Sequence, residues 1–220
     1  MSQSTGYVLG LIKDPKLNPF YLLRNVTDRT IYNLTTIGLQ GRMMYDLPDA
    51  THRRILTASI NSFHDYDKII REMVVRSISD SYIVIDKFDM VADLIRKKFL
   101  STPVQSHEYA NLSRFELDHY RDIILPLITN GNRIILVSKP RTLYSPNGKP
   151  LHNVGFSGLK RTDYWCHDIC YFMNTEPCTL LMHYTRYGEY RPFLQEPTIE
   201  RIEEILNNDA KTATNETTTD

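Results

Sequence analysis

The residues with the widest chemical scope lie in one stretch of the chain, Trp165–Thr185. All three cysteines and two of the seven histidines occur there. Cysteine and histidine bind zinc, and together with a carboxylate they also form nucleophilic catalytic sites. The stretch therefore has three interpretations: a metal site, a thiol nucleophile, or a strand hairpin whose cysteines are small hydrophobic core residues.

The local sequence favours the hairpin. Aromatic and β-favouring residues dominate both Trp165–Met173 and Thr179–Tyr187. Between these segments, Asn174–Pro177 has the composition of a turn. The two segments are therefore expected to be antiparallel neighbours in a sheet.

An extended conformation places the thiols too far apart for a shared metal ion. Side chains alternate between the faces of a strand, so Cys178 and His183 point to opposite faces. Cys166 and Cys170 share a face, but at ~3.3 Å per residue their Cα atoms lie roughly 13 Å apart. Zinc requires each sulfur at about 2.3 Å. No metal and no other cofactor is therefore expected.

The same hairpin can align a thiol with a base. A four-residue loop between the strands places Asp168 opposite His183. Cys166 and Cys170 then lie diagonally from the histidine, at about 7–8 Å between Cα atoms. A Cys/His/Asp-dependent hydrolase or transferase is therefore an alternative function. The simpler interpretation, which the sequence favours, makes the cysteines buried core residues and Asp168–His183 a cross-strand polar pair.

The overall charge argues against a protein whose affinity depends on phosphate contacts. Lys and Arg together number 26, as do Asp and Glu, so the formal net charge is zero. Nucleic-acid-binding domains usually carry a basic excess. Short basic clusters and 14 tyrosines nevertheless supply the residue types that bind single-stranded nucleic acid. A nucleic-acid-binding module is therefore a third alternative.

The elements that position these residues change in type along the chain. Strand-favouring runs occur at residues 6–13 and 20–27, and a further strand is expected within 37–44. Helical periodicity dominates from about residue 48 to residue 130. Within this region, residues 48–79 form either one helix or two.

Capping and composition mark the later elements. Asp86 is the expected cap of a helix over 88–99, and Ser113–Glu116 fits a capping box at the start of another helix. Residues 132–193 are rich in strand signals, and a last helix is expected to begin at Glu196. Residues 207–220 contain no large apolar residue and are expected to form a disordered polar tail.

Segregated helices and strands predict an α+β fold. We expect a single domain over residues 1–206, with a helical middle and a strand-rich region after it. Its antiparallel sheet is built from N-terminal and C-terminal strands. The sheet packs against a central group of three or four helices plus one C-terminal helix.

The function favoured by the sequence is non-catalytic. We expect a structural, adaptor or inhibitory protein that contacts a protein partner or associates with itself, a character that suits a virus-encoded accessory protein. Aromatic and arginine residues dominate protein–protein hot spots, and they cluster near the end of the strand-rich region. The expected interaction surface consists of Tyr184, Arg186, Tyr187, Tyr190, Arg191 and Phe193.

The cellular location is expected to be the cytoplasm or the nucleus. Three cysteines, an odd number, suit a reducing compartment. The first residues lack the charged segment and long apolar run of an export signal. No stretch reaches the length of a membrane span, so no membrane partner is expected.

Overall fold

The computed structural model describes residues 6–13, 17–36, 47–175, 178–184 and 190–205. In this part of the chain, eight strands form one sheet in the order β10-β9-β8-β1-β5-β4-β2-β3, and β6 and β7 form a separate hairpin. The strands are β1 (Tyr7–Lys13), β2 (Ile31–Thr36), β3 (Ile55–Ile60), β4 (Tyr82–Asp86), β5 (Arg133–Ser138), β6 (Pro140–Tyr144), β7 (Pro150–Phe156), β8 (Asp168–Thr175), β9 (Cys178–Tyr184) and β10 (Tyr190–Gln195).

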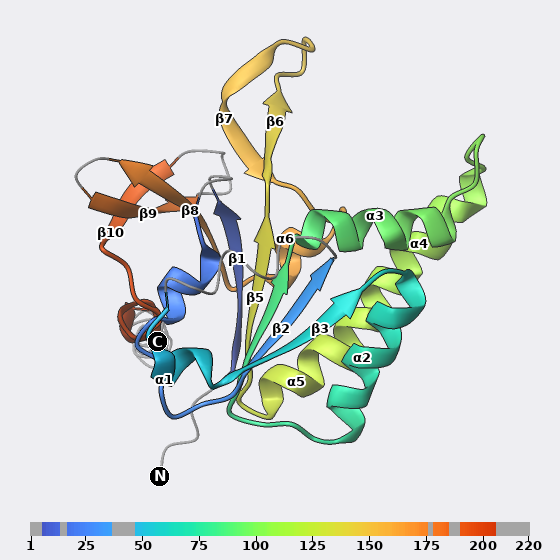
Figure 1. The fold of residues 1–220 in the computed structure, drawn as a ribbon. Coiled ribbons are helices and arrows are strands. Elements are labelled where there is room, and N and C mark those ends of the chain that lie inside the picture. Colours follow the sequence, from blue (N-terminus) through green and yellow to red (C-terminus); the bar gives the residue numbers. More distant parts are fainter. Residues whose placement is uncertain (1–5, 14–16, 37–46, 176–177, 185–189, 206–220) are drawn as a thin grey trace, which may run out of the picture.

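Helices cover both faces of this sheet (Figure 1). The helical elements are η1 (Pro19–Leu23), α1 (Asp49–His52), α2 (Phe63–Val75), α3 (Phe88–Phe99), α4 (Ser106–His119), the π-helical turn η2 (Tyr120–Ile124), α5 (Leu125–Thr129), α6 (Thr162–Trp165) and a helical segment at 199–205. One hydrophobic cluster joins the sheet to α2, α3, α4 and α5. A second joins the opposite face to η1 and the 199–205 segment. The sheet is therefore the middle of three layers.

The sheet is mostly parallel, so the antiparallel sheet expected from the sequence is wrong, although the mixture of helices and strands is confirmed. β8, β1, β5, β4, β2 and β3 form successive parallel pairs. Within this sheet, the antiparallel pairs of described residues are β8–β9 and β9–β10. The central strands are buried on both faces and read as continuous apolar runs, which carry no signal of strand direction.

The region expected to be helical over residues 48–79 contains a strand. β3 separates α1 from α2 and pairs with β2. The sequence pattern is misleading because Leu56 and Ile60 are four residues apart, a spacing that fits both a helix and one face of a strand. In β3, an edge strand of the sheet, Ile60 is buried whereas Leu56 is 55% exposed.

Two further local predictions are wrong. Residues 20–27 do not form the expected strand, because the chain begins η1 there: Asn18 Oδ1 accepts a hydrogen bond of 3.0 Å from the Phe20 N–H, and a proline follows the cap. The capping box of α4 is formed by Gln105 and Glu108, and Ser113–Glu116 lies inside the helix. The expected strand within 37–44 and the tail at 207–220 lie outside the described residues.

Several predicted elements are confirmed. β1, β4, β5 and α3 occupy the segments that the sequence indicates, and β8 and β9 form the expected hairpin. β6 and β7 form a second hairpin, whose turn contains Gly148 at φ 75°. Gly131, at φ 78°, ends α5 in the left-handed conformation that favours glycine.

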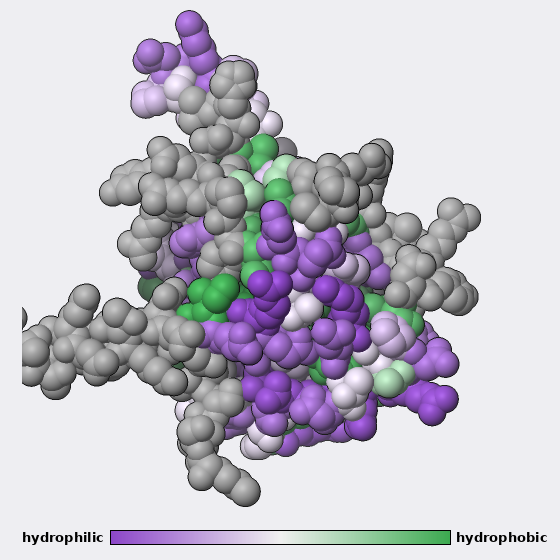
Figure 2. Space-filling view, turned by 90° about the vertical axis from the view of Figure 1, so that its left-hand side faces the viewer, coloured by the Kyte–Doolittle hydropathy of each residue, from purple (hydrophilic) through white to green (hydrophobic). Residues whose placement is uncertain are grey.

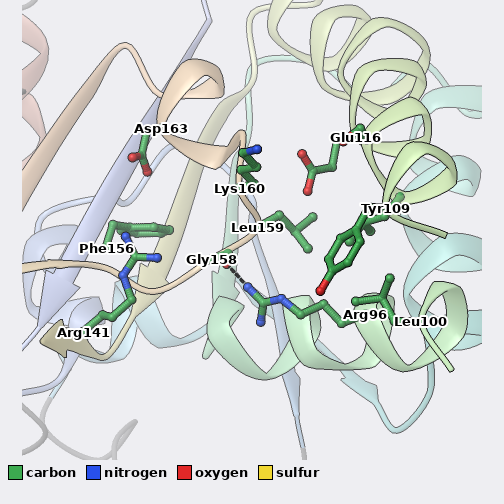
Figure 3. A pocket seen from close by; sticks show the side chains of 12 residues that line it. Arg96, Leu100, Tyr109, Glu116, Arg141, Phe156, Gly158, Leu159, Lys160 and Asp163 are labelled. Carbon is green, nitrogen blue, oxygen red and sulfur yellow. Dashed lines mark hydrogen bonds between the residues drawn. The ribbon is translucent and has the colours of Figure 1, made fainter. Parts of the chain in front are cut away.

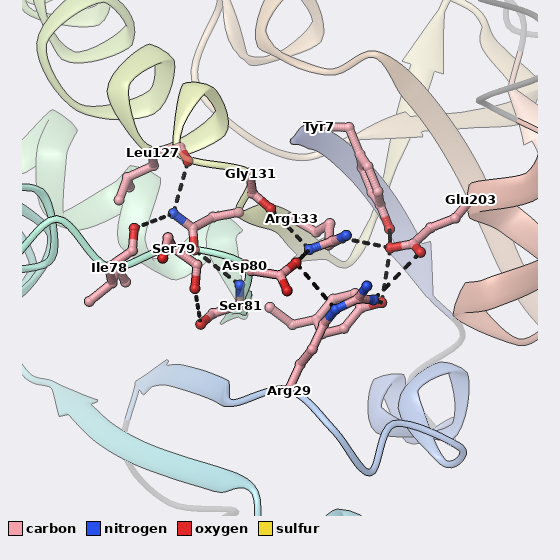
Figure 4. Close-up of polar contacts among 12 residues, drawn as sticks. Tyr7, Arg29, Ile78, Ser79, Asp80, Ser81, Leu127, Gly131, Arg133 and Glu203 are labelled. Carbon is pink, nitrogen blue, oxygen red and sulfur yellow. Dashed lines mark hydrogen bonds and ion pairs between the residues drawn. The ribbon is translucent and has the colours of Figure 1, made fainter. Parts of the chain in front are cut away.

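A buried arginine ties the amino end of the sheet to the C-terminal helical segment (Figure 4). The Arg133 side chain, only 1% exposed, extends from β5 and donates a hydrogen bond of 2.8 Å to Glu203 in the 199–205 segment. It also pairs with Asp80, just before β4. Tyr82 and Tyr7 donate hydrogen bonds of 2.9 and 3.4 Å to the same Glu203 oxygen. Four separate elements therefore meet at one buried polar network.

Removing the arginine from this network should destabilise the fold strongly. We expect Arg133→Met to lower the free energy of unfolding by roughly 3 kcal/mol, because breaking a buried pair leaves the remaining charge uncompensated. Arg121→Met is the matched control, since the Arg121 side chain is 67% exposed and pairs with Asp118 and Asp122 at the surface. It should cost less than about 1 kcal/mol. Urea unfolding measures both values, and equal losses would contradict the structural role of Arg133.

Candidate functional site

The carboxyl ends of the central parallel strands meet at one edge of the sheet. The next described element after β2 is α1, which lies on the η1 side of the sheet: its Thr51 hydroxyl donates a hydrogen bond of 2.7 Å to the Arg24 carbonyl, next to η1. The chain leaves β4 directly into α3, which packs in the opposite layer. Because β2 and β4 are neighbours, the described elements that follow them, α1 and α3, lie in opposite layers. Such a switch point is the usual place of ligand sites in α/β folds.

Polar side chains occupy interior positions at this edge. Alternation along β2 and β4 puts Asn33, Thr35 and Asp86 on the same face of the sheet as the core residue Val84. Their exposed fractions are only 4%, 5% and 8%. In the parallel register of β2 and β4, Thr35 and Asp86 occupy neighbouring positions. Burying a polar group costs free energy unless it forms a hydrogen bond, so three neighbouring buried polar side chains are unusual.

Asp86 and Asn33 each keep one buried oxygen, Oδ1 in both, without a hydrogen-bond partner among the described residues. Burial raises the pKa of the Asp86 carboxyl, although Lys13 and Lys87 oppose this shift. An unsatisfied buried polar group costs about 1–3 kcal/mol. Two such oxygens on one face therefore leave hydrogen-bond acceptors that no described residue uses.

The turn from β4 into α3 presents Asp86 at the start of a helix. Lys87 alone separates the two elements, and it adopts the left-handed conformation, φ 57° and ψ 50°, at a cost of roughly 1 kcal/mol for a residue with a Cβ. Lys87, not Asp86, is the N-cap, so the cap expected from the sequence is wrong. The backbone N–H of Lys87 forms a hydrogen bond with the Asp86 carboxyl and opposes the rise of its pKa, and the N-terminus of α3 adds a partial positive charge at this end of the helix.

A second carboxylate, Asp89 in α3, is paired with Lys139, which follows β5. Asp89 Oδ2 lies 3.2 Å from Lys139 Nζ, with the carboxylate side chain 8% and the lysine side chain 65% exposed. Ser138, the last residue of β5, donates a hydrogen bond of 2.6 Å to the Ser157 carbonyl and accepts one of 3.0 Å from its N–H. The backbone before Lys139 is therefore held in place. We call Lys13, Asn33, Thr35, Asp86, Asp89 and Lys139 the carboxyl-edge site.

The carboxyl-edge site combines acid–base capacity with positive charge. A carboxyl group whose pKa is raised can both donate and accept a proton closer to neutral pH. Lys13, Lys87 and Lys139 lie at the ends of the strands, and the N-terminus of α3 adds a partial positive charge. The arrangement suits an anionic molecule that exchanges a proton with Asp86.

The predicted cysteine site has a different register from the one expected. Thr175 lies opposite Cys178, so the pairing is shifted by two residues, and Cys170 rather than Asp168 lies opposite His183. An even shift keeps the thiol, the carboxylate and the imidazole on one face. Asp168 lies between the other two groups: its Oδ1 is 2.6 Å from His183 Nε2, and its Oδ2 accepts a 3.6 Å hydrogen bond from the Cys170 thiol.

Cys166 is not part of this cluster. It precedes β8, at the end of α6, and a Cβ added to Gly10 would lie 3.0 Å from its Sγ. It packs against the core cluster on the α3 side of the sheet, whereas Cys170 belongs to the opposite cluster. The expectation that both cysteines share a face is therefore wrong, because only Cys170 lies within the extended strand. Burial raises the pKa of both thiols, with Asp168 contributing in each case.

Four of the six residues of the predicted interaction surface lie in the described strands β9 and β10. Tyr184 belongs to β9, and Tyr190, Arg191 and Phe193 belong to β10. Arg186 and Tyr187 lie outside the described residues. The described residues on this side of the molecule present mainly hydrophilic groups, with smaller hydrophobic areas between them (Figure 2).

Sequence reasoning missed Asp86 as a site residue. Its signal is present: a continuous apolar run ends in an aspartate, and a helix begins two residues later. This pattern gains meaning only when β4 is parallel to its neighbours, because the strand end then lies at the ligand-binding edge. In the antiparallel sheet expected from the sequence, the end of this strand would not mark a ligand-binding edge.

Comparisons with known proteins supply no further assignment. No protein-family model matches the chain, and no curated protein matches it significantly. Within the described ranges, no three His, Cys, Asp or Glu side chains are grouped to hold a metal ion. In the same part of the chain, no helix is long and apolar enough to cross a membrane.

Replacing Asp86 should increase stability at neutral pH. Because the folded-state pKa of Asp86 is raised, the native state loses stability as the pH rises through that pKa. Asn does not titrate, so Asp86→Asn should gain about 1–3 kcal/mol at pH 7 and much less below about pH 4. Asp89→Asn is the matched control, and it should lose stability because Lys139 loses its partner. Urea unfolding from pH 4 to pH 7 measures both, and a destabilised Asp86→Asn at pH 7 would show that Asp86 is a structural residue.

The buried thiols should react slowly. Iodoacetamide at pH 7.5 is expected to leave Cys166 and Cys170 unmodified in the folded protein and to modify them in denaturant, because the thiolate is the reactive species. Peptide mass spectrometry reports each cysteine separately. Rapid modification of Cys170 in the folded state, slowed by His183→Ala, would instead support the Cys/His/Asp alternative.

Proposed function

We propose that the protein is an enzyme that acts on a small anionic substrate at the carboxyl-edge site, with Asp86 as the general acid and base. The observation that carries the proposal is the buried Oδ1 of Asp86 at the carboxyl edge of the sheet, which has no hydrogen-bond partner among the described residues. Burial of this carboxyl is expected to lower stability. Functional groups are the usual reason for such a cost.

The charges around Asp86 support an anionic substrate. Lys13 and Lys87 act electrostatically on the Asp86 carboxyl, and Lys139 is fixed beside Asp89. The first turn of α3 adds N–H donors that suit a phosphate or carboxylate group. The substrate is therefore expected to place its anionic group between the lysines and its reacting group at Asp86.

Proton transfer assigns Asp86 a defined role. In its protonated form Asp86 donates to a leaving or carbonyl oxygen, and in its ionised form it accepts the proton of a nucleophile. Asn33 and Thr35, on the same face, offer an amide and a hydroxyl that orient a polar substrate. This role needs no activated thiol, which accords with the raised pKa values of Cys166 and Cys170.

A non-catalytic role through protein contacts, favoured by the sequence, is a second proposal. The β6–β7 hairpin supports it, because it projects beyond the body of the molecule (Figure 1) and Tyr144 at the end of β6 is 64% exposed. A two-stranded hairpin is only marginally stable alone, so a partner would stabilise it. Sedimentation at several concentrations tests self-association, and a monomer at every concentration would oppose that form of the proposal.

Anion binding at the carboxyl-edge site can be measured without knowledge of the substrate. We expect inorganic phosphate to shift the amide NMR signals of Lys13, Lys87, Phe88 and Lys139 in the labelled protein. Lys139→Ala should weaken this binding several-fold, because one cation is lost. Asp86→Asn should strengthen it, because a negative charge near the anion is removed.

Lys149→Ala is the control, since Lys149 is exposed in the β6–β7 hairpin turn. It should leave the phosphate titration unchanged. The proposal would be wrong if phosphate shifted none of these amides, or if Lys139→Ala and Lys149→Ala behaved alike.

A further inference from the structure

A separate cleft of about 540 Å³ opens between α3, α4 and the loop that joins β7 to α6. This volume lies within the range of roughly 300–1,000 Å³ that holds small organic ligands. Arg96, Tyr109, Glu116 and Lys160 point toward the same space from these elements (Figure 3). The cleft does not include any residue of the carboxyl-edge site.

Gly158 allows the loop to form the floor of the cleft. A Cβ at this position would lie 2.8 Å from the Thr162 hydroxyl and 3.0 Å from the Phe156 ring. Its carbonyl accepts a hydrogen bond from the Arg96 guanidinium. Leu159 and Thr162 are fixed as well, because the Leu159 N–H donates a 2.9 Å hydrogen bond to the Thr162 hydroxyl. The floor is therefore rigid before any ligand arrives.

Glu116 is the unusual residue of this cleft. It extends from α4, is 1% exposed, and its Oε2 has no hydrogen-bond partner among the described residues. The backbone N–H groups of Lys160 and Arg161 bind the carboxylate, so part of its capacity anchors the loop. Burial nevertheless raises the pKa of Glu116. The free oxygen remains available to a ligand that donates a hydrogen bond.

Positive charge surrounds this carboxylate. Arg96, Arg141 and Lys160 line the cleft, together with Asp163 and Glu116 as the acidic residues. Arg96 is held by the Gly158 carbonyl and by Asp93 at 2.7 Å. Arg141 and Lys160 form no ion pair within the described part of the chain. Both side chains are exposed, and Arg141 acts electrostatically on the nearby Asp163 carboxyl, so an anionic group of a ligand would lie between two cations of this cleft.

Apolar side chains complete the lining. Leu100, Leu112, Phe156 and Leu159 contribute hydrophobic surface, and Tyr109, 57% exposed, stands at the mouth. Aromatic rings and aliphatic groups bind the flat face of a ring system well. A ligand that satisfies the cleft thus combines an anionic group, a hydrogen-bond donor and an apolar ring.

We propose that this cleft binds a nucleotide, or another small organic phosphate of that size, whose amino or hydroxyl group donates to Glu116 while Arg141 and Lys160 hold the phosphate. The ring of the ligand packs against Tyr109 and the aliphatic lining. This site is distinct from the carboxyl-edge site and does not depend on the proposed enzymatic function.

Isothermal titration calorimetry with AMP, GMP, CMP and UMP tests this site in the full-length protein. At least one nucleotide is expected to bind with a dissociation constant below about 1 mM, more tightly than inorganic phosphate and than the matching nucleoside. Glu116→Gln keeps the size of the side chain and an oxygen for the loop, but it places an amide donor against the donor of the ligand. It should weaken binding by roughly tenfold or more.

Two comparisons show whether Glu116 contacts the nucleotide or only anchors the loop between β7 and α6. A purely structural Glu116 would lower the melting temperature in Glu116→Gln and leave the dissociation constant unchanged, which would overturn the proposal. Lys160→Ala and Arg141→Ala should each weaken nucleotide binding several-fold. Lys97→Ala and Arg114→Ala are matched controls, because both side chains are exposed outside the cleft.

The proposals for the cleft and for the carboxyl-edge site can be tested separately. Asp86→Asn should leave nucleotide affinity in the cleft unchanged, and Glu116→Gln should leave phosphate-induced shifts at Lys139 unchanged. The cleft proposal is overturned if no nucleotide binds below about 1 mM, or if the cleft and control variants bind equally.

Discussion

The parallel alignment of β1, β5, β4 and β2 is the constraint on which the rest of the structure depends. Parallel strands require crossover connections, which place helices on both faces and bury the strands completely. The same alignment gathers every carboxyl end at one edge of the sheet. Lys13, Asp86 and Lys139, far apart in the sequence, therefore belong to one edge, and no local interaction brings them together.

The two edges of this sheet differ in how their polar groups are satisfied. At the amino edge, buried Arg133 is paired with Asp80 and Glu203, and the network joins β5, β4 and the 199–205 segment. At the carboxyl edge, Asp86 is buried beside lysines but keeps an oxygen without a partner among the described residues. The guanidinium of buried Arg133 is thus paired with two carboxylates, whereas Asp86 combines burial with an unused acceptor. This unused acceptor is a local cost that ligand binding would offset.

Much of the local structure could be predicted from the sequence, because period and turn chemistry are local properties. β4, β5 and α3 follow directly from apolar runs and helical spacing. Strand direction could not be predicted, since fully buried strands show no alternation. The register of β8 against β9 also depends on the loop between them. A difference of two residues places Cys170, rather than Asp168, directly opposite His183. The chemistry of Asp86 and Glu116 depends on burial by distant elements, which no spacing along the chain encodes.

The most direct measurement is the titration of the Asp86 side-chain carboxyl carbon by ¹³C NMR in the folded protein. Burial, with no described partner for Oδ1, predicts a pKa above the ordinary value of about 3.9 for aspartate. A bound ligand that donates a hydrogen bond to this oxygen should lower that pKa. An Asp86 pKa at or below that ordinary value would mean that the carboxyl is already satisfied, and the account of the carboxyl-edge site would be contradicted.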